Sequence, residues 1–157
     1  MATVPRNGIL KYQGPDSRRE YPNLALNTIH AGDFVYVDQT TYDIKALDTD
    51  AHAQYFVGVS EDTQDTAYDA YPGQTDPSKM SVVGKGWAKQ YTTNGETYVP
   101  NQTLYLGANA QTVTNVTGSF KVGFVADLPD GSQLSLVGTG TNFVVVELLK
   151  AWPNSAL

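Results

Sequence analysis

The pattern of apolar and polar positions contains one pair of strand motifs that occurs twice along the chain. In the first copy, residues 32–38 form a short alternating strand motif, and the apolar run 56–59 follows after a gap. In the second copy, residues 101–107 show the same kind of motif and are followed by the apolar run 122–125. Period-two alternation is typical of half-buried strands. The repeat therefore predicts two halves of similar β structure, related by pseudo-symmetry.

Further strands are predicted around these motifs. Residues 24–29, 79–83, 86–90 and 134–137 are short segments bounded by turn residues, and the nearly continuous apolar run at 143–146 favours a buried strand. About eight or nine short strands at this spacing are typical of a small barrel or sandwich. We therefore predict an all-β fold, a β-tulip-like small β-barrel or β-sandwich.

Each apolar run of the repeated motif has a glycine at its centre, Gly58 in the first and Gly123 in the second. Glycine inside a strand often marks a bulge or a tight bend at a barrel corner. The alternative is a glycine that the strand merely tolerates. We predict a bulge or bend at both positions.

The 157 residues are predicted to form one domain with two irregular additions. Residues 1–23 hold prolines, glycines and charges without strand periodicity, which favours an extended N-terminal arm that is mobile in the free protein. Residues 24–157 make up the β domain, and it contains a long polar connection at 61–78. Connections of this length inside a compact domain are usually functional loops or insertions.

The formal net charge of −6 is unevenly distributed. Residues 1–20 carry four basic and two acidic side chains, a balance of +2, so the rest of the chain carries −8. The acidic body argues against nucleic acid and against an anionic membrane as partners. The chain has no cysteine, which excludes disulfides and thiolate chemistry. The N-terminus lacks the apolar core of a secretory signal, so we expect synthesis in a cytoplasm.

Neither histidine fits a reaction centre. His30 and His52 are the only candidates for acid–base catalysis near neutral pH, and the chain has no glycine-flanked serine of the nucleophile-elbow type. We therefore predict half-exposed histidines in turns, no catalytic residue, no cofactor and no enzymatic activity. A small β-barrel enzyme is a minor alternative.

One segment faintly resembles a calcium-binding loop. Asp48-Thr49-Asp50 matches its beginning, but the expected glycine is absent and the twelfth position is Val59, which has no carboxylate. Solvated loop acids without a metal are the favoured interpretation. The alternative is a cation shared among the acids of two loops: Asp43, Asp48 and Asp50 with Glu61, Asp62 or Asp65.

The order of the strand motifs supports a family resemblance. The motifs are AGDFVYV at 31–37, FVGV at 56–59, VVGKGWA at 82–88, QTLYLG at 102–107, KVGFV at 121–125 and VVV at 144–146. In this order, with a Gly-aromatic-Ala strand between two similar halves, they resemble the strands of the small capsid cement, or head-decoration, proteins of bacteriophages. The resemblance covers about residues 29–149. The long connection at 61–78 and the extended basic arm depart from the family pattern.

The resemblance implies a virion protein without chemistry of its own. Such proteins bind the outer surface of an icosahedral head, stabilise contacts between major capsid proteins, and commonly form homotrimers. The expected partners are therefore the major capsid protein and further copies of this chain. The alternative is a carbohydrate-binding β module of a phage tail or fibre, because acids and tyrosines such as Tyr42 lie in predicted loops and suit sugar binding.

The basic arm supplies the predicted capsid contacts. Arginine binds carboxylates in a bidentate geometry, and tyrosine offers contact area at little cost in conformational entropy. An extended arm is also suited to strand addition on a neighbouring subunit. The candidate interface residues are Arg6, Lys11, Tyr12, Arg18, Arg19 and Tyr21.

Overall fold

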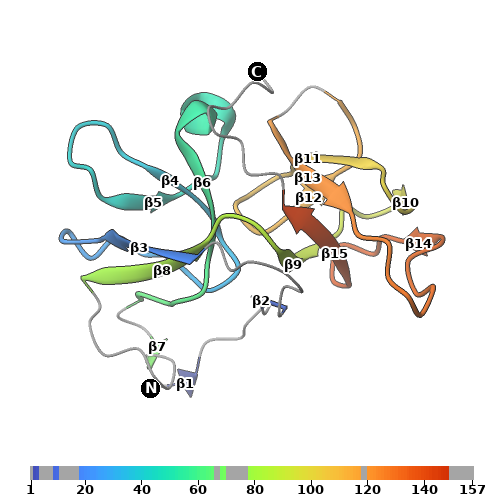
Figure 1. The fold of residues 1–157 in the computed structure, drawn as a ribbon, viewed down its shortest axis with the longest axis horizontal. Helices are drawn as coiled ribbons and strands as arrows, with labels where there is room; N and C mark the ends of the chain where they lie inside the picture. Colours follow the sequence, from blue (N-terminus) through green and yellow to red (C-terminus); the bar gives the residue numbers. More distant parts are fainter. Residues whose placement is uncertain are drawn as a thin grey trace.

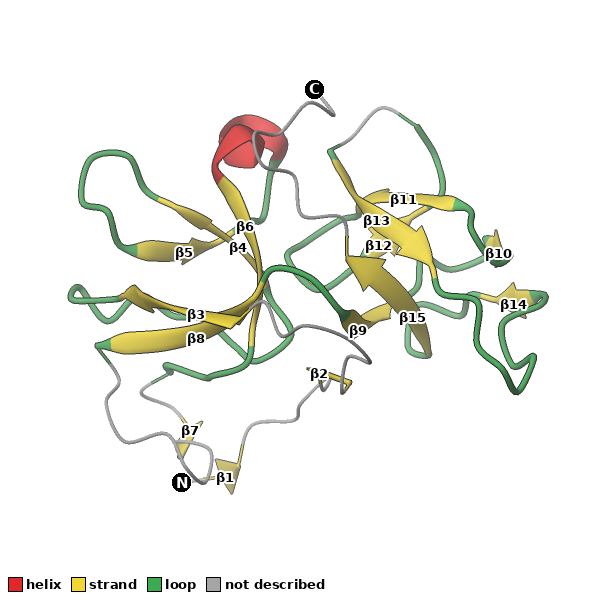
Figure 2. Cartoon of the chain, viewed as in Figure 1, coloured by secondary structure: helices red, strands yellow, loops and turns green. Residues whose placement is uncertain are grey.

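Strands make up most of the regular structure in the computed structural model (Figures 1 and 2). Within the described residues, the one helical element is the short 3-10 helix η1 (Asp50–Tyr55). No helix in the described part of the chain is long and apolar enough to cross a membrane. The all-β prediction is confirmed. The structure describes residues 2–3, 9–10, 18–65, 68–69, 78–117 and 120–148.

The first large sheet has five antiparallel strands in the order β3-β8-β6-β4-β5. It lies on the left in Figure 1, where the blue and green parts of the chain meet. Its strands alternate with turns rich in Gly, Asn, Asp and Thr, which end each extended segment. In chain order the strands are β3 (Arg18–Pro22), β4 (Phe34–Val37), β5 (Ile44–Ala46), β6 (Phe56–Ser60) and β8 (Lys79–Val83).

The second large sheet has the order β12-β11-β13-β15-β9-β2 and lies on the right in Figure 1. Two short ladders accompany the large sheets: β1 (Ala2–Thr3) pairs with β7 (Tyr68–Asp69), and β10 (Thr97–Tyr98) pairs with β14 (Leu136–Val137). The described strands form open sheets and not one closed barrel. The second sheet consists of β2 (Ile9–Leu10), β9 (Trp87–Tyr91), β11 (Thr103–Leu106), β12 (Val113–Thr114), β13 (Lys121–Val125) and β15 (Phe143–Leu148).

The two large sheets repeat the same arrangement. Strands β4, β5, β6, β8 and β3 of the first sheet correspond in order to β11, β12, β13, β15 and β9 of the second. The strand register is also equivalent, because Val35 pairs with Gly58 in one sheet and Leu104 pairs with Gly123 in the other. In both sheets the register shifts one residue after that pair. The predicted pseudo-symmetry is confirmed, and residues 18–83 and 87–148 form the two halves.

The equivalence extends to the turns that lead into β4 and β11. The Asp33 carboxylate accepts a hydrogen bond from the His30 N–H at 2.8 Å. At the matching place, the Gln102 side-chain oxygen accepts one from the Val99 N–H at 3.2 Å. The two turns use different side chains for the same bond, so only the structure reveals this part of the repeat. Position 30 thus corresponds to 99, and 33 to 102.

Both central glycines allow a neighbouring strand to approach closely. A Cβ on Gly58 would lie 2.1 Å from the Val83 carbonyl oxygen of β8, and Gly58 has a φ of 143°. A Cβ on Gly123 would lie 2.2 Å from the Glu147 carbonyl oxygen of β15. Each glycine stands beside the register shift of its sheet. The prediction of a bulge at both positions is confirmed, and the close approach explains why no larger residue fits.

One hydrophobic core joins the two halves. Phe34 and Phe56 of the first half meet edge to face, with ring centroids 6.0 Å apart. Phe56 in turn meets Phe120 of the second half at 5.2 Å in the same geometry. A second, smaller cluster lies within the first half and includes Val35 and Met80. The shared core makes the halves a single packed unit.

The strand predicted at 24–29 is wrong. The Asn23 side chain accepts a hydrogen bond from the Asn27 N–H at 2.8 Å and donates to the Asn27 carbonyl at 3.1 Å, which closes a turn. Leu26 has a φ of 52°, a left-handed conformation that no strand contains. Only Ile29 makes an isolated bridge, with Gln64. Local side-chain bonds have replaced the ladder here.

Three further boundaries differ from the sequence prediction. Residues 18–22 belong to β3, paired along β8, although the sequence places them in the arm. Residues 44–46 form β5, although the sequence prediction places no strand there. Of 134–137, only Leu136 and Val137 pair as a strand. In each case pairing with a distant strand decides the outcome, and a local pattern does not report it.

Candidate functional site

The structure places half of the predicted interface residues. Arg18, Arg19 and Tyr21 lie on β3 at one edge of the first sheet. Arg6, Lys11 and Tyr12 lie outside the described residues.

The three residues on β3 have different environments. Arg18 Nε lies 2.8 Å from the Glu61 carboxylate, so its charge is engaged within the chain. Tyr21 is half-buried and packs against the smaller core cluster. Arg19 is exposed. Of these three side chains, Arg19 is therefore best placed to meet an acidic partner.

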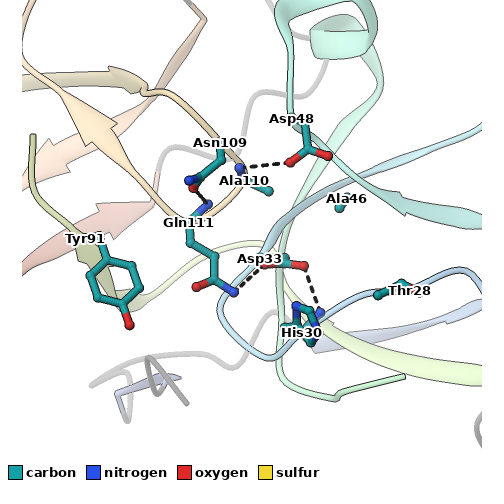
Figure 3. Close-up of a pocket in the computed structure, with 9 residues that line it drawn as sticks. All are labelled: Thr28, His30, Asp33, Ala46, Asp48, Tyr91, Asn109, Ala110 and Gln111. Atoms are coloured by element: carbon teal, nitrogen blue, oxygen red, sulfur yellow. Dashed lines mark hydrogen bonds between the residues drawn. The ribbon is translucent and has the colours of Figure 1, made fainter. Parts of the chain in front are cut away.

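A cleft of about 520 Å³ with polar walls lies where the two halves meet (Figure 3). The hairpin between β11 and β12 forms one wall and reaches across to the first half. The turn before β4 and the segment after β5 form the opposite wall. The residues around the cleft are Thr28, His30, Asp33, Ala46 and Asp48 from the first half, and Tyr91, Asn109, Ala110 and Gln111 from the second.

A buried carboxylate holds the β11–β12 hairpin against the first half. Asp33 is 5% exposed. Its oxygens accept hydrogen bonds from the His30 N–H at 2.8 Å and from the Gln111 amide at 2.7 Å. Burial raises the pKa of Asp33 above its usual range, and the two hydrogen bonds partly oppose that increase. Asp33 thus acts as a structural acceptor whose bonding capacity is used within the protein.

More hydrogen bonds cross the same boundary. The Asp48 carboxylate accepts from the Ala110 N–H at 3.2 Å, and the Phe34 N–H donates to the Ala110 carbonyl at 2.7 Å. The buried Gln90 amide donates to the Gly32 carbonyl at 3.0 Å. The docked hairpin is therefore fixed by directional bonds as well as by the core.

The histidines occupy structural positions. His30 is half-exposed in a turn, as predicted, and its Nε2 lies 2.7 Å from the Asp65 carboxylate. For His52 the prediction is wrong, because this residue is exposed on the 3-10 helix η1 and its ring stacks on Tyr36 with centroids 4.6 Å apart. These contacts orient the rings toward an acid and an aromatic ring.

The acids of the possible calcium loop are separated by the fold. Asp43 accepts a hydrogen bond from the Ala25 N–H, Asp48 from the second half, and Asp50 from the Phe120 N–H. Each carboxylate thus holds a different backbone segment. No group of three or more metal-ligating side chains gathers in the described part of the chain.

Large exposed apolar side chains form a feature that sequence analysis missed except at Tyr42. In the described residues they fall into two groups, and each half carries one group. The first half presents Leu24, Leu26 and Tyr42; the second presents Val99, Val116, Leu134 and Val137. The sequence gives no signal for most of them, because apolar residues in a strand pattern are assigned to the core by default.

Comparison with known proteins gives a likeness in fold. No family model and no curated protein matches the chain. Among solved structures, a chain of "The capsid of Myoviridae Phage XM1" is similar at 15% identity and a TM-score of 0.49. The match covers 100% of this chain and 94% of that chain. Neither value assigns a function to this protein.

Proposed function

We propose that this chain is a structural protein of a bacteriophage virion, and specifically a decoration protein. In this role it binds the outer surface of the icosahedral head as a homotrimer and stabilises contacts between major capsid proteins. It works by binding and not by catalysis. The host cytoplasm, where heads assemble, suits a chain without cysteine.

The observation that carries the proposal is where the family-like motifs lie. The six motifs quoted from the sequence fall on β4, β6, β8 with β9, β11, β13 and β15. These strands form the shared framework of two equivalent sheets. The motifs that resemble cement proteins thus lie in one framework of strands, which supports the proposal.

The polar groups of the described chain support the same interpretation. Asp33, Asp48 and Asp50 each tie one half to a backbone N–H or an amide of the other half or of its own turn. Such a network makes a rigid body, which suits a protein that must reinforce a shell. It leaves no pair of groups arranged as nucleophile and base among these acids.

The second candidate, a carbohydrate-binding module of a phage tail or fibre, is favoured by one observation. The cleft between the halves is lined by the exposed Asp48, the side-chain amides of Asn109 and Gln111 and the Tyr91 ring, groups that bind sugar hydroxyls and stack on sugar rings. A glycan array distinguishes the two functions: strong selective binding of a glycan would support the module, and stoichiometric binding to heads would support decoration.

The primary experiment measures binding to expanded heads that lack the protein. The purified chain is mixed with such heads, bound protein is separated by sedimentation, and occupancy is counted per major capsid protein. Saturation at a fixed ratio and greater resistance of the heads to heat are expected. Binding that never saturates, or none, contradicts the proposal.

Removing residues 1–17 is expected to weaken binding to heads while the first sheet and strands β9, β11, β12, β13 and β15 of the second remain folded; the deletion takes away the edge strand β2 and the short strand β1. The deletion keeps β3 complete, because β3 begins at Arg18 and pairs with β8 along its length. It removes the basic residues of the arm that lie before the domain. Occupancy at subsaturating concentration measures binding, and circular dichroism checks the fold. Unchanged occupancy would show that the arm is not an anchor.

Reversing the charge of Arg19 is expected to weaken binding to heads moderately. An exposed ion pair contributes about 0.2–1 kcal/mol, so Arg19→Glu is expected to reduce affinity up to about five-fold. Raising the salt concentration should weaken the wild type by a similar factor. Lys121→Glu, on β13 of the other half, carries the same charge change and serves as the control. Wild-type binding that is insensitive to salt would contradict an electrostatic role.

A further inference from the structure

The pseudo-symmetry makes a direct comparison of the two hairpins possible. The hairpin at 107–112, between β11 and β12, corresponds to the hairpin at 38–43, between β4 and β5. The equivalent bonds Gly107 N–H to Thr112 carbonyl and Asp38 N–H to Asp43 carbonyl, at 2.7 and 2.8 Å, set the match. By this register, Gln111 corresponds to Tyr42.

The two hairpins differ in what they contact. In the second half, Gln111 and Ala110 dock on the first half through Asp33 and Asp48. In the first half, the equivalent hairpin projects from the end of the molecule and Tyr42 is 65% exposed (Figure 1). The same structural element is thus docked in one half and undocked in the other.

The surface that receives a hairpin is likewise present twice. In the first half it includes His30, Asp33 and Asp48, and the docked hairpin bonds to the two carboxylates beside the open cleft. In the second half, Val99 stands in place of His30 and Gln102 in place of Asp33. Val116, after β12, matches the buried Leu47 by the same register but is exposed, and the Asn115 side chain beside it donates to the Thr97 carbonyl, two residues before Val99. Val99 is 41% exposed and Val116 is 61% exposed.

Two matched positions are polar in the docked pair and apolar in the undocked pair: Gln111 matches Tyr42, and His30 matches Val99. The docked hairpin is polar, with Gln111, and meets a polar surface at His30 and Asp33. The undocked hairpin carries Tyr42, and the undocked surface carries Val99 and Val116. Apolar character on both sides is what a contact driven by the hydrophobic effect requires.

Nearby charges do not oppose such a contact. Beside the exposed hairpin, Asp38 and Lys45 pair at 2.8 Å. Beside the exposed surface, the Glu96 carboxylate accepts hydrogen bonds from the Tyr98 hydroxyl and from the Asn115 N–H. Both regions therefore present apolar side chains next to internally satisfied acids.

The exposed hairpin and the turn beside it also hold strained backbone. Tyr42 has a φ of 61° and Leu26 a φ of 52°, in the left-handed region that disfavours large side chains. The bond from the Ala25 N–H to Asp43, at 2.8 Å, joins the two segments. Strained residues that remain exposed and apolar are typical of binding sites, where the conformation is prepared for the partner.

We propose that the 38–43 hairpin of one copy docks on the Val99–Val116 surface of a second copy. The contact repeats, between chains, the contact that joins the two halves within a chain. The contact is head-to-tail, because one copy contributes a surface of its first half and the other a surface of its second half. Head-to-tail contacts form a closed ring when the rotation between neighbouring copies brings the last copy back to the first. The inference rests on the homotrimer of the proposed function and names its contact surfaces.

The test uses variants that each disable one side of the contact in the full chain. Tyr42→Lys disables the hairpin, and Val99→Lys combined with Val116→Lys disables the surface. Wild type is expected to associate in sedimentation velocity, and each variant alone is expected to be monomeric. Mixed together, the two variants are expected to form a one-to-one dimer, since each retains the surface that the other lacks.

Two further variants keep the test independent of folding defects. Ala51→Lys, an exposed apolar-to-lysine change on η1, is the matched control and is expected to associate like wild type. Tyr42→Asn removes the apolar ring but suits the left-handed conformation. It is expected to melt at the same or a higher temperature than wild type and still to lose association.

Association is measured on the free protein, so its result does not depend on whether the protein binds to heads. A monomeric wild type at concentrations well above those used for head binding would overturn the proposal. So would association that survives Tyr42→Asn, or mixed variants that remain monomeric. If the proposal fails in this way while the protein still saturates heads, the decoration role stands without the head-to-tail contact.

Discussion

Replacing Gly58 with alanine is expected to destabilise the protein by about 4 kcal/mol or more. The added Cβ would lie 2.1 Å from the Val83 carbonyl oxygen and 2.7 Å from its carbon, and both are backbone atoms of the neighbouring strand. The strand cannot retreat without breaking the ladder between β6 and β8. The φ of 143° adds strain for any residue with a side chain. Chemical denaturation measures the change in the free energy of unfolding.

Substitutions at two other glycines separate the steric clash of the added Cβ from the strain of a positive φ. Gly123→Ala carries the steric clash, at 2.2 Å from the Glu147 carbonyl oxygen, and is expected to cost about 3 kcal/mol. Gly95 has a φ of 85° with nothing within 4 Å of an added Cβ, so Gly95→Ala isolates the backbone conformation and is expected to cost about 1 kcal/mol. A Gly58→Ala protein no less stable than Gly95→Ala would show that β8 is not held against β6.

Truncating Phe120 to alanine is expected to cost about 3–5 kcal/mol. The ring is fully buried and meets Phe56 across the boundary between the halves at 5.2 Å. Its removal leaves a cavity in the core that both halves share, and the surrounding β structure collapses only partially. The whole protein should lose stability together, with fluorescence and circular dichroism giving coincident unfolding transitions.

An exposed position provides the comparison for Phe120. Asp127→Ala, at an exposed residue outside the core, is expected to change stability by less than about 0.5 kcal/mol. Two separate unfolding transitions in Phe120→Ala, with one half melting first, would contradict a single shared core. The same measurement therefore tests whether the halves behave as one unit.

The Gly and Phe variants test the stability of the two sheets and their core, and the hairpin variants test association between copies. Gly58 and Phe120 lie in the equivalent sheets and the common core, whereas Tyr42 and Val99 lie on exposed ends. Variants at the exposed ends should leave the free energy of unfolding nearly unchanged in a monomer. A variant at Tyr42 or Val99 that stops associating but keeps its free energy of unfolding has therefore lost the contact and not the fold.

The sequence by itself determined the all-β class and the internal repeat. Alternation and internal glycines are local properties, and they placed β4, β6, β11, β13 and β15 within a few residues of their observed positions. Gly58 and Gly123 could be predicted as bulge positions because only glycine serves where a strand must bend or admit a close neighbour. The half-exposed state of His30 also followed from its place between turn residues.

Tertiary structure alone decided which segments pair and which apolar residues stay outside. Residues 18–22 became a strand only through β8, and 24–29 lost its strand character to the bonds between Asn23 and Asn27. The docking of Gln111 on Asp33 joins positions far apart in the chain, and no local pattern encodes it. Exposure of Tyr42 and Val99 is likewise a result of packing, because burial depends on which surfaces meet and not on the hydrophobicity of one residue.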